Sequence, residues 1–248
     1  MKTRVKSRFS LGMKIVGILS CLAIVSVGFA AWWVIKLPEP KTLESGSFTV
    51  YAVDEKNIEF SDISAEGNAD ITFGAPETPE GTGWLGYTGI ANDHLTAILK
   101  FTVSVNDAND KLSNYLDGIT VEFNPGAVYS SLLADNVKKH YVAEPEIYYQ
   151  VDGTDENSWN ELTNNLVPAP ASDSADVYLK FVFKWGDATE NENPYNYFND
   201  KTIDEDHALI EGKTNKEVAL DMLGAVRDLN TNKYNVKITA TAKAANNG

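Results

Sequence analysis

Alternation of apolar and polar side chains is the feature that most constrains the fold of this chain. Six apolar residues stand at every second position from Leu95 to Val105, with polar side chains between them except at Ile98. This two-residue period is that of a strand with one buried face. Runs with similar patterns, most of which end at turn residues, lie at 47–53, 71–73, 119–123, 147–151, 177–185 and 234–242. The chain is therefore predicted to consist mainly of β-strands.

One segment has helical periodicity instead. Its apolar residues, which would share one helix face, are Val218, Met222, Ala225, Val226 and Leu229. Thr214 and Glu217 in front of them have the spacing of a helix capping box. Many short strands and a single late helix favour an all-β fold, an antiparallel, jelly-roll-like β-sandwich with one surface helix, over residues 47–245.

A different composition marks the N-terminal segment. Residues 1–14 are basic, and the 21 residues of 15–35 carry no charge. As a helix rising ~1.5 Å per residue, 15–35 would reach about 30 Å and span a bilayer core, with the basic end inside. Residues 36–46 include Pro38 and Pro40 and are predicted to be an extended spacer.

The same hydrophobic segment also fits a cleavable signal peptide. Gly28 and Ala30 are small residues at the positions that a signal peptidase inspects, which would place the cut before Ala31. Cleavage would yield a secreted protein, whereas retention would yield a cell-surface protein anchored by one hydrophobic helix. Both interpretations send the C-terminal part outside the cell.

Charge is divided unevenly along the chain. Residues 1–36 hold six of the 21 basic residues and none of the 35 acidic residues, so the remainder carries a formal charge of −20. Such a field repels nucleic acid, which excludes that class of partner. The single cysteine, Cys21, lies in the hydrophobic segment, so the acidic part can form no disulfide.

The N-terminal residues also resemble those of a known family. Leu11-Gly12-Met13-Lys14, the apolar stretch and then Gly28-Phe29-Ala30-Ala31-Trp32 look like the signal peptides of the TasA/camelysin family. These are surface and biofilm-matrix proteins of Firmicutes, which are Gram-positive bacteria. The resemblance implies export, a β-rich body and a structural role that includes self-association. The pair Trp32-Trp33 departs from the polar start expected for such a mature chain.

No catalytic motif is recognisable, so we expect a protein that is not an enzyme. His94, His140 and His207 stand far apart, and none has the i, i+4 partner of zinc peptidases, so they are expected to be scattered surface residues. No nucleophile elbow or phosphate-binding loop is present.

Acidic turns are the weak candidates for a calcium site, and no other cofactor is expected. The first turn contains Asp107 and Asp110, and the second contains Asp204 and Asp206. Calcium prefers several oxygen ligands held by loops, but neither turn has the spacing of a twelve-residue calcium loop. A solvated acidic turn is the alternative interpretation for both.

A cluster of aromatic residues offers two interpretations. It comprises Trp185, at the end of a predicted strand, and Tyr195, Tyr197 and Phe198 in the following loop. Exposed rings would form a platform for a glycan or a protein ligand, because they offer large contact area at small entropic cost. Alternatively, Trp185 ends the core and the loop aromatics fold back onto it.

The strand directly behind the spacer is the candidate for assembly. Phe48, Val50 and Ala52 would fill one face, while Tyr51 and Val53 occupy the other. Such a terminal strand can pair with a neighbouring molecule, or it can complete its own sandwich. We therefore expect a non-enzymatic cell-surface or extracellular-matrix structural protein that self-associates. The alternative is an adhesin-like surface module that binds a glycan or a protein through the aromatic loop.

Overall fold

The computed structural model describes residues 41–53, 57–74, 92–106, 110–153, 158–198 and 201–243. The chain divides into two units, Met1–Glu39 and Pro40–Gly248, and every described element belongs to the second. The hydrophobic segment 15–35 therefore lies outside the described residues. Among the residues that are described, no helix is long and apolar enough to cross a membrane.

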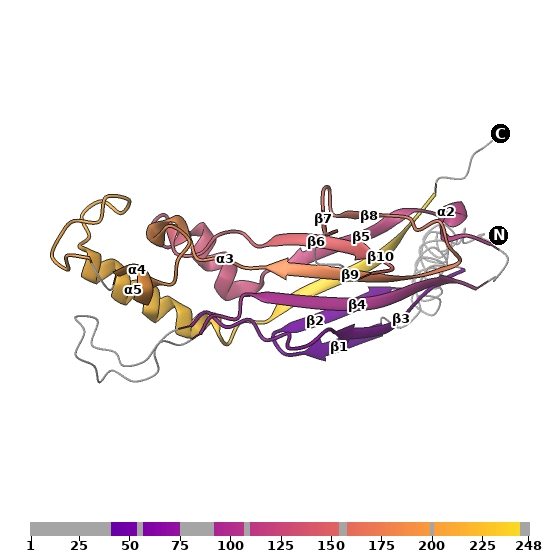
Figure 1. Cartoon of the computed structure of the whole chain (residues 1–248), viewed down its shortest axis with the longest axis horizontal. Helices are drawn as coiled ribbons and strands as arrows, with labels where there is room; N and C mark the ends of the chain where they lie inside the picture. The colour runs from indigo at the N-terminus through magenta and orange to yellow at the C-terminus, as the bar shows by residue number, and fades with distance from the viewer. Residues whose placement is uncertain are drawn as a thin grey trace, which may run out of the picture. The chain divides into compact units, whose positions relative to one another are not determined.

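Ten strands form two five-stranded sheets that pack together as a sandwich (Figure 1). Sheet A has the order β1-β2-β10-β5-β8, and its strands are β1 (Lys41–Ser45), β2 (Phe48–Val53), β10 (Tyr234–Ala242), β5 (Leu116–Asn124) and β8 (Leu166–Pro168). Sheet B has the order β3-β4-β9-β6-β7, and its strands are β3 (Ile58–Ala65), β4 (Thr96–Val105), β9 (Ser174–Val182), β6 (Glu146–Val151) and β7 (Asn160–Glu161).

Sheet B is antiparallel throughout, as predicted, but sheet A is mixed. Its second strand, β2, pairs with β1 in an antiparallel hairpin and with β10 in parallel, from Tyr234 opposite Phe48 to Thr239 opposite Val53. The expectation of a purely antiparallel sandwich is therefore wrong for sheet A. Alternation shows which face of a strand is buried but not the direction of its neighbour.

The strongest sequence pattern corresponds to β4, whose burial alternates along its whole length. Ala97, Leu99, Phe101 and Val103 are all buried, and Ile98 lies on the other face. The predicted strands at 47–53, 119–123, 147–151 and 234–242 are likewise confirmed as β2, β5, β6 and β10. Residues 71–73 form only an isolated bridge from Thr72 to His94.

Four strands without clear alternation were not predicted from the sequence. One of them, β1, lies inside the predicted spacer, so strand pairing begins at Lys41 rather than at Ser47. The others are β3, β7 and β8. In β3 the alternation is broken by a bulge between Ser61 and Ser64, where Asp62 has a left-handed φ of 50°.

The described chain has more helices than the single one predicted. The capped helix α5 (Asn215–Leu229) is confirmed, with Val218, Met222 and Leu229 buried. The additional helices are α2 (Leu112–Tyr115), α3 (Gly126–Ala134) and α4 (Pro194–Phe198), with 3-10 turns η1 (Lys138–His140) and η2 (Asp187–Thr189). In Figure 1, α3, α4 and α5 gather at one end of the sandwich, here called the helical end.

Candidate functional site

The N-terminal hairpin, β1 and β2, contains the residues predicted for assembly. Its turn passes through Gly46, whose φ of 55° is left-handed. A Cβ on this glycine would lie 2.6 Å from Oδ1 of Asp70 and 2.7 Å from the carbonyl carbon of Ala69. The hairpin turn therefore needs glycine both for its backbone conformation and for its close approach to the neighbouring segment.

The predicted assembly residues lie in the core of their own sandwich. Phe48, Val50 and Ala52 are at most 1% exposed, whereas Tyr51 on the opposite face is 37% exposed. The alternation predicted for this strand is therefore confirmed for these four residues, while the side chain of Val53 lies outside the described set.

An aromatic cluster holds the hairpin in place. The ring centroid of Phe48 lies 5.1 Å from that of Phe181 and 5.3 Å from that of Tyr234. Phe123 and Phe183 join the same cluster. Without the hairpin, these rings would lose a large apolar partner, and such aromatic contacts dominate the energetics of protein cores.

The outer edge of the hairpin lies beside β3 of the other sheet. Lys41 on β1 donates to Oε1 of Glu59 at 2.9 Å and also to the carbonyl oxygen of Phe60. The hairpin thus meets the rest of the domain through the β2–β10 ladder, the aromatic cluster, the charged contact of Lys41 and hydrogen bonds made by Ser47 at its turn.

The predicted aromatic platform is not formed as a set of exposed rings. Trp185 and Phe198 are only 1% and 0% exposed, so neither offers a surface to a ligand. Tyr195 and Tyr197 are half-buried against the core. The interpretation of Trp185 and Phe198 as core residues therefore holds, and a ligand-binding role would depend on the two tyrosines alone.

The Asp93 carboxylate connects several segments around Trp185 through hydrogen bonds. No sequence signal predicted this role. Its carboxylate accepts hydrogen bonds from Trp185 Nε1 at 2.9 Å, Asn193 Nδ2 at 3.1 Å and the backbone N–H of Gly74 at 2.5 Å. Asn193 also donates to the carbonyl oxygen of Gly74 at 2.9 Å. These contacts join segments about 20, 90 and 100 residues apart, so they could not be read from local spacing.

Among the calcium candidates, Asp110 stabilises its own turn by accepting hydrogen bonds from the residues that follow it. Its carboxylate accepts hydrogen bonds from the Tyr115 hydroxyl, the Asn114 amide and the backbone N–H of Lys111, which hold the pKa of Asp110 below its usual value. Asp107 lies outside the described residues.

The second acidic turn is exposed. Asp204 and Asp206 both lie at the surface, and Asp206 forms a backbone bridge with Thr214. In the described part of the chain, no three His, Cys, Asp or Glu side chains are grouped so that they could hold a metal ion.

The three histidines occupy separate environments. Nδ1 of His94 contacts the carbonyl oxygen of Asp70, and Nδ1 of His140 lies 2.9 Å from Oδ1 of Asp187. Both are half-buried, whereas His207 is only 7% exposed. The expectation of a surface residue is therefore wrong for His207.

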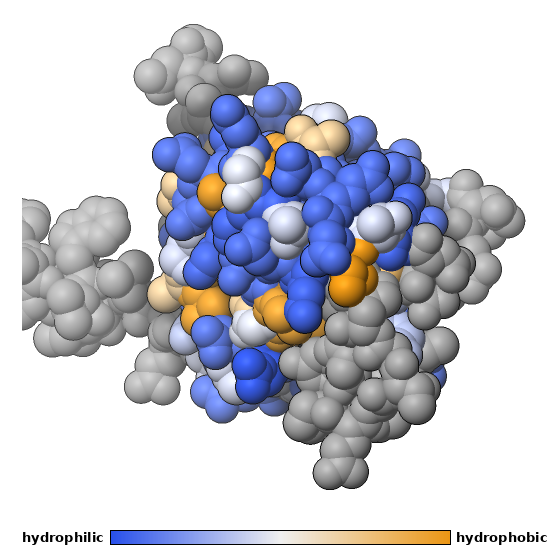
Figure 2. All heavy atoms as spheres, turned by 90° about the vertical axis from the view of Figure 1, so that its left-hand side faces the viewer, coloured by the Kyte–Doolittle hydropathy of each residue, from blue (hydrophilic) through white to orange (hydrophobic). Residues whose placement is uncertain are grey.

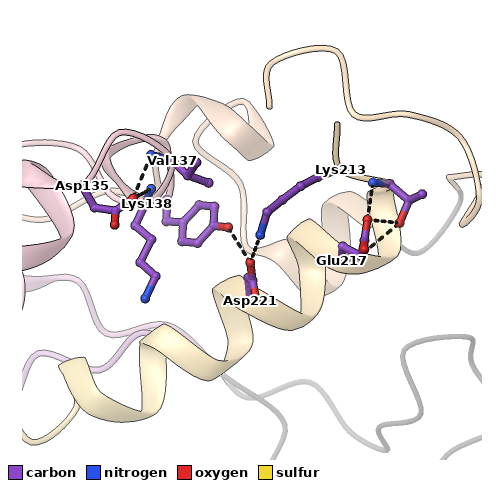
Figure 3. A network of polar contacts seen from close by, with 8 residues as sticks. Asp135, Val137, Lys138, Lys213, Glu217 and Asp221 are labelled. Carbon is purple, nitrogen blue, oxygen red and sulfur yellow. Dashed lines mark hydrogen bonds and ion pairs between the residues drawn. The ribbon is translucent and has the colours of Figure 1, made fainter. Parts of the chain in front are cut away.

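A polar network joins α5 to the segments around it (Figure 3). The carboxylate of Asp221 on α5 forms an ion pair with the Lys213 ammonium. Its Oδ2 also accepts a hydrogen bond from the Tyr141 hydroxyl at 3.4 Å. Burial, and secondarily the Asp221 charge, raise the pKa of Tyr141. A tyrosine held protonated in this way acts as a hydrogen-bond donor, so this part of the network ties helix α5 to the segment before β6.

The network also contains two turn-capping carboxylates. Backbone N–H groups of Lys138 and Val137 donate to Asp135 at 2.9 and 2.8 Å and lower its pKa. Glu217 accepts from the backbone N–H of Thr214 at 2.8 Å, and Thr214 Oγ1 accepts from the Glu217 N–H at 3.3 Å. These reciprocal bonds confirm the predicted capping box.

Figure 2 looks onto the helical end of the molecule. The described surface seen there is mainly hydrophilic, with small separate hydrophobic patches. The large apolar side chains with the greatest exposure in the described chain are Tyr51, Leu209 and Leu220. In this view, the described atoms form no broad apolar surface that would mark a docking site.

The predicted cleavage residues Gly28, Ala30 and Ala31 lie outside the described residues. Comparison of the chain with protein-family models, curated proteins and solved structures finds no match.

Proposed function

We propose that this chain is an exported, non-enzymatic structural protein of a bacterial surface or extracellular matrix, similar to the TasA/camelysin family. In this proposal, molecules associate by exchanging the β1–β2 hairpin. The observation that carries it is the position of the hairpin, which opens the folded unit and inserts Phe48 into an aromatic cluster of other strands. The same contacts can form between molecules when a neighbour supplies the hairpin.

Edge-to-edge pairing of intact sandwiches through β1 or β3 is the less favourable route. The outer strand β1 carries Lys41 and Glu44, and β3 contains a bulge at Asp62. Charges and bulges on edge strands are common features that prevent such pairing. Exchange instead preserves a ladder, from Tyr234–Phe48 to Thr239–Val53, that already exists within one molecule.

A disulfide can report which molecule supplies the hairpin. Thr49 on β2 stands opposite Asn235 on β10, and both side chains are half-buried. Neighbouring strands lie about 4.8 Å apart, within the Cα separation that a disulfide spans. The test is the full-length chain with Thr49→Cys and Asn235→Cys, in which the natural Cys21 is replaced by serine.

Multimers isolated by ultracentrifugation would be oxidised and run on a non-reducing denaturing gel. Exchange predicts a ladder of covalently linked chains that collapses to monomer on reduction. Multimers that yield only internally cross-linked monomers would refute exchange, and a protein that never assembles would refute self-association. Each single-cysteine variant, T49C or N235C, controls for random linkage.

A pair of substitutions on β2 tests the role of its buried face. Val50→Asp should abolish assembly, because it places a carboxylate in the aromatic-rich core. Tyr51→Asp, the matched control on the exposed face of the same strand, should assemble normally. Electron microscopy of the two purified variants gives the readout, and normal multimers from V50D would contradict the proposal.

A further inference from the structure

Residues 46–48, the turn of the β1–β2 hairpin and the first residue of β2, are here called the hairpin tip. The N–H of Ser47 donates to the carbonyl oxygen of Ala69 at 3.3 Å, and the N–H of Ile71 donates to Oγ of Ser47 at 3.2 Å. The carbonyl oxygen of Ser47 accepts from the N–H of Tyr234 at 2.9 Å. Ser47 therefore bonds outside the hairpin through its N–H, its carbonyl oxygen and its hydroxyl.

The Phe48 side chain fills a pocket of aromatic rings beside these hydrogen bonds. It is 1% exposed, and its ring centroid lies 5.1 Å from that of Phe181 and 5.3 Å from that of Tyr234. The ring of Phe183 lies at 6.3 Å. A slip of the strand by two residues would preserve the alternation but bring Val50, which has no ring, to this pocket. The pocket therefore fixes the register of the hairpin.

The rest of the hairpin makes contacts that other strands could also make. The side chains of Lys41 and Glu59, which pair at the far end, are 35% and 52% exposed, and exposed ion pairs contribute little to stability. Val50 and Ala52 require only that alternate side chains be apolar, which is common in β-strands. The tip thus contains the features that distinguish this hairpin from another amphipathic strand.

We infer that the hairpin tip selects the partner during exchange, and that this partner is a second copy of the chain. The inference rests on the exchange proposed above, because an incoming hairpin must make the same contacts in another molecule. A strand without the Ser47 hydroxyl would leave the buried N–H of Ile71 unpaired, and one without the Phe48 ring would leave a cavity in the pocket. Both defects lower the affinity of a wrong partner, which is how specificity arises.

A synthetic peptide of residues 41–53 tests this selection on the full-length wild-type chain in detergent micelles. Added before assembly, the peptide should occupy the site beside β10 and reduce the amount of multimer that sediments in the ultracentrifuge.

Three variant peptides separate the tip from the rest of the hairpin. Phe48→Ala should need about a hundred-fold higher concentration for the same effect, because it leaves the aromatic pocket empty. Ser47→Ala should need about ten-fold more, because it leaves one N–H unpaired. Tyr51→Ala, the control on the exposed face of the same strand, should compete as well as the wild-type peptide.

Equal competition by the wild-type and F48A peptides, or no competition by any of them, would overturn selection by the tip. The disulfide ladder would still report exchange in those cases, so failure of the selection is distinguishable from failure of exchange. A wild-type chain that never forms multimers would refute self-association and this inference together. Because the variant residues are in the peptides, a folding defect of the chain cannot imitate these results.

Discussion

At the residue scale, two buried tyrosines of the core differ in what their hydroxyl groups contact. Burial raises the pKa of both Tyr129 and Tyr234, so both hydroxyls stay protonated. Tyr129 donates to the carbonyl oxygen of Ala143 at 2.5 Å. The Tyr234 hydroxyl is also buried, but its polar neighbour, the Asn232 side chain, lies outside ordinary hydrogen-bond geometry. Only the Tyr129 hydroxyl therefore makes a hydrogen bond of ordinary geometry that a substitution would remove.

Replacing each tyrosine by phenylalanine should separate the two cases. Tyr129→Phe should lower the free energy of unfolding by about 1–3 kcal/mol, because it leaves a carbonyl oxygen without its donor. Tyr234→Phe should be neutral or stabilise by up to about 1 kcal/mol, since it removes from the core a polar atom that makes no hydrogen bond of ordinary geometry. Urea denaturation of the full-length variants measures both, and equal losses would contradict the assignment.

At the element scale, helix α5 depends on a capping carboxylate. Hydrogen bonds from the Thr214 backbone and hydroxyl lower the pKa of Glu217. The unfolded chain, with the higher carboxyl pKa, takes up the proton first. The contribution to stability is therefore complete above about pH 4.5 and is lost as the pH falls through the lower, folded-state pKa.

Glu217→Gln should lower the melting temperature at pH 7 by about 2–4 °C and reduce the further loss between pH 5 and 3. Glu211→Gln is the control, because Glu211 is exposed and makes no hydrogen bond or ion pair within the described chain. Calorimetry at both pH values would show the difference, and a wild-type acid response in E217Q would exclude this role.

At the scale of the whole molecule, the distribution of charge along the chain predicts its orientation across the membrane. The basic residues before the hydrophobic segment favour a cytoplasmic N-terminus, which leaves the part with a formal charge of −20 outside. In a Gram-positive host, a C-terminal tag should be removed by protease added to intact cells. Intact-mass measurement should then show whether the chain begins at Ala31 or retains its hydrophobic segment. A tag protected from protease would contradict export.

Local pattern was sufficient for the elements whose faces differ strongly in polarity. The alternation of Leu95–Val105 and the capping box at Thr214 each depend on neighbours within a few residues, so the sequence alone predicted β4 and α5. The short helix α3 was missed because Pro125 and Gly126, which open it, are also typical turn residues.

Contacts between distant segments required the tertiary structure. The parallel pairing of β2 with β10, the burial of Trp185 and the donors around Asp93 join positions far apart in the chain. The sequence around His207 likewise does not indicate that this side chain is buried. The sequence by itself determined which residues prefer a core and where strands and a helix form, because those preferences are local. Only the tertiary structure decided which strands pair, in which direction, and which polar atoms are buried, because packing of the whole chain sets these contacts.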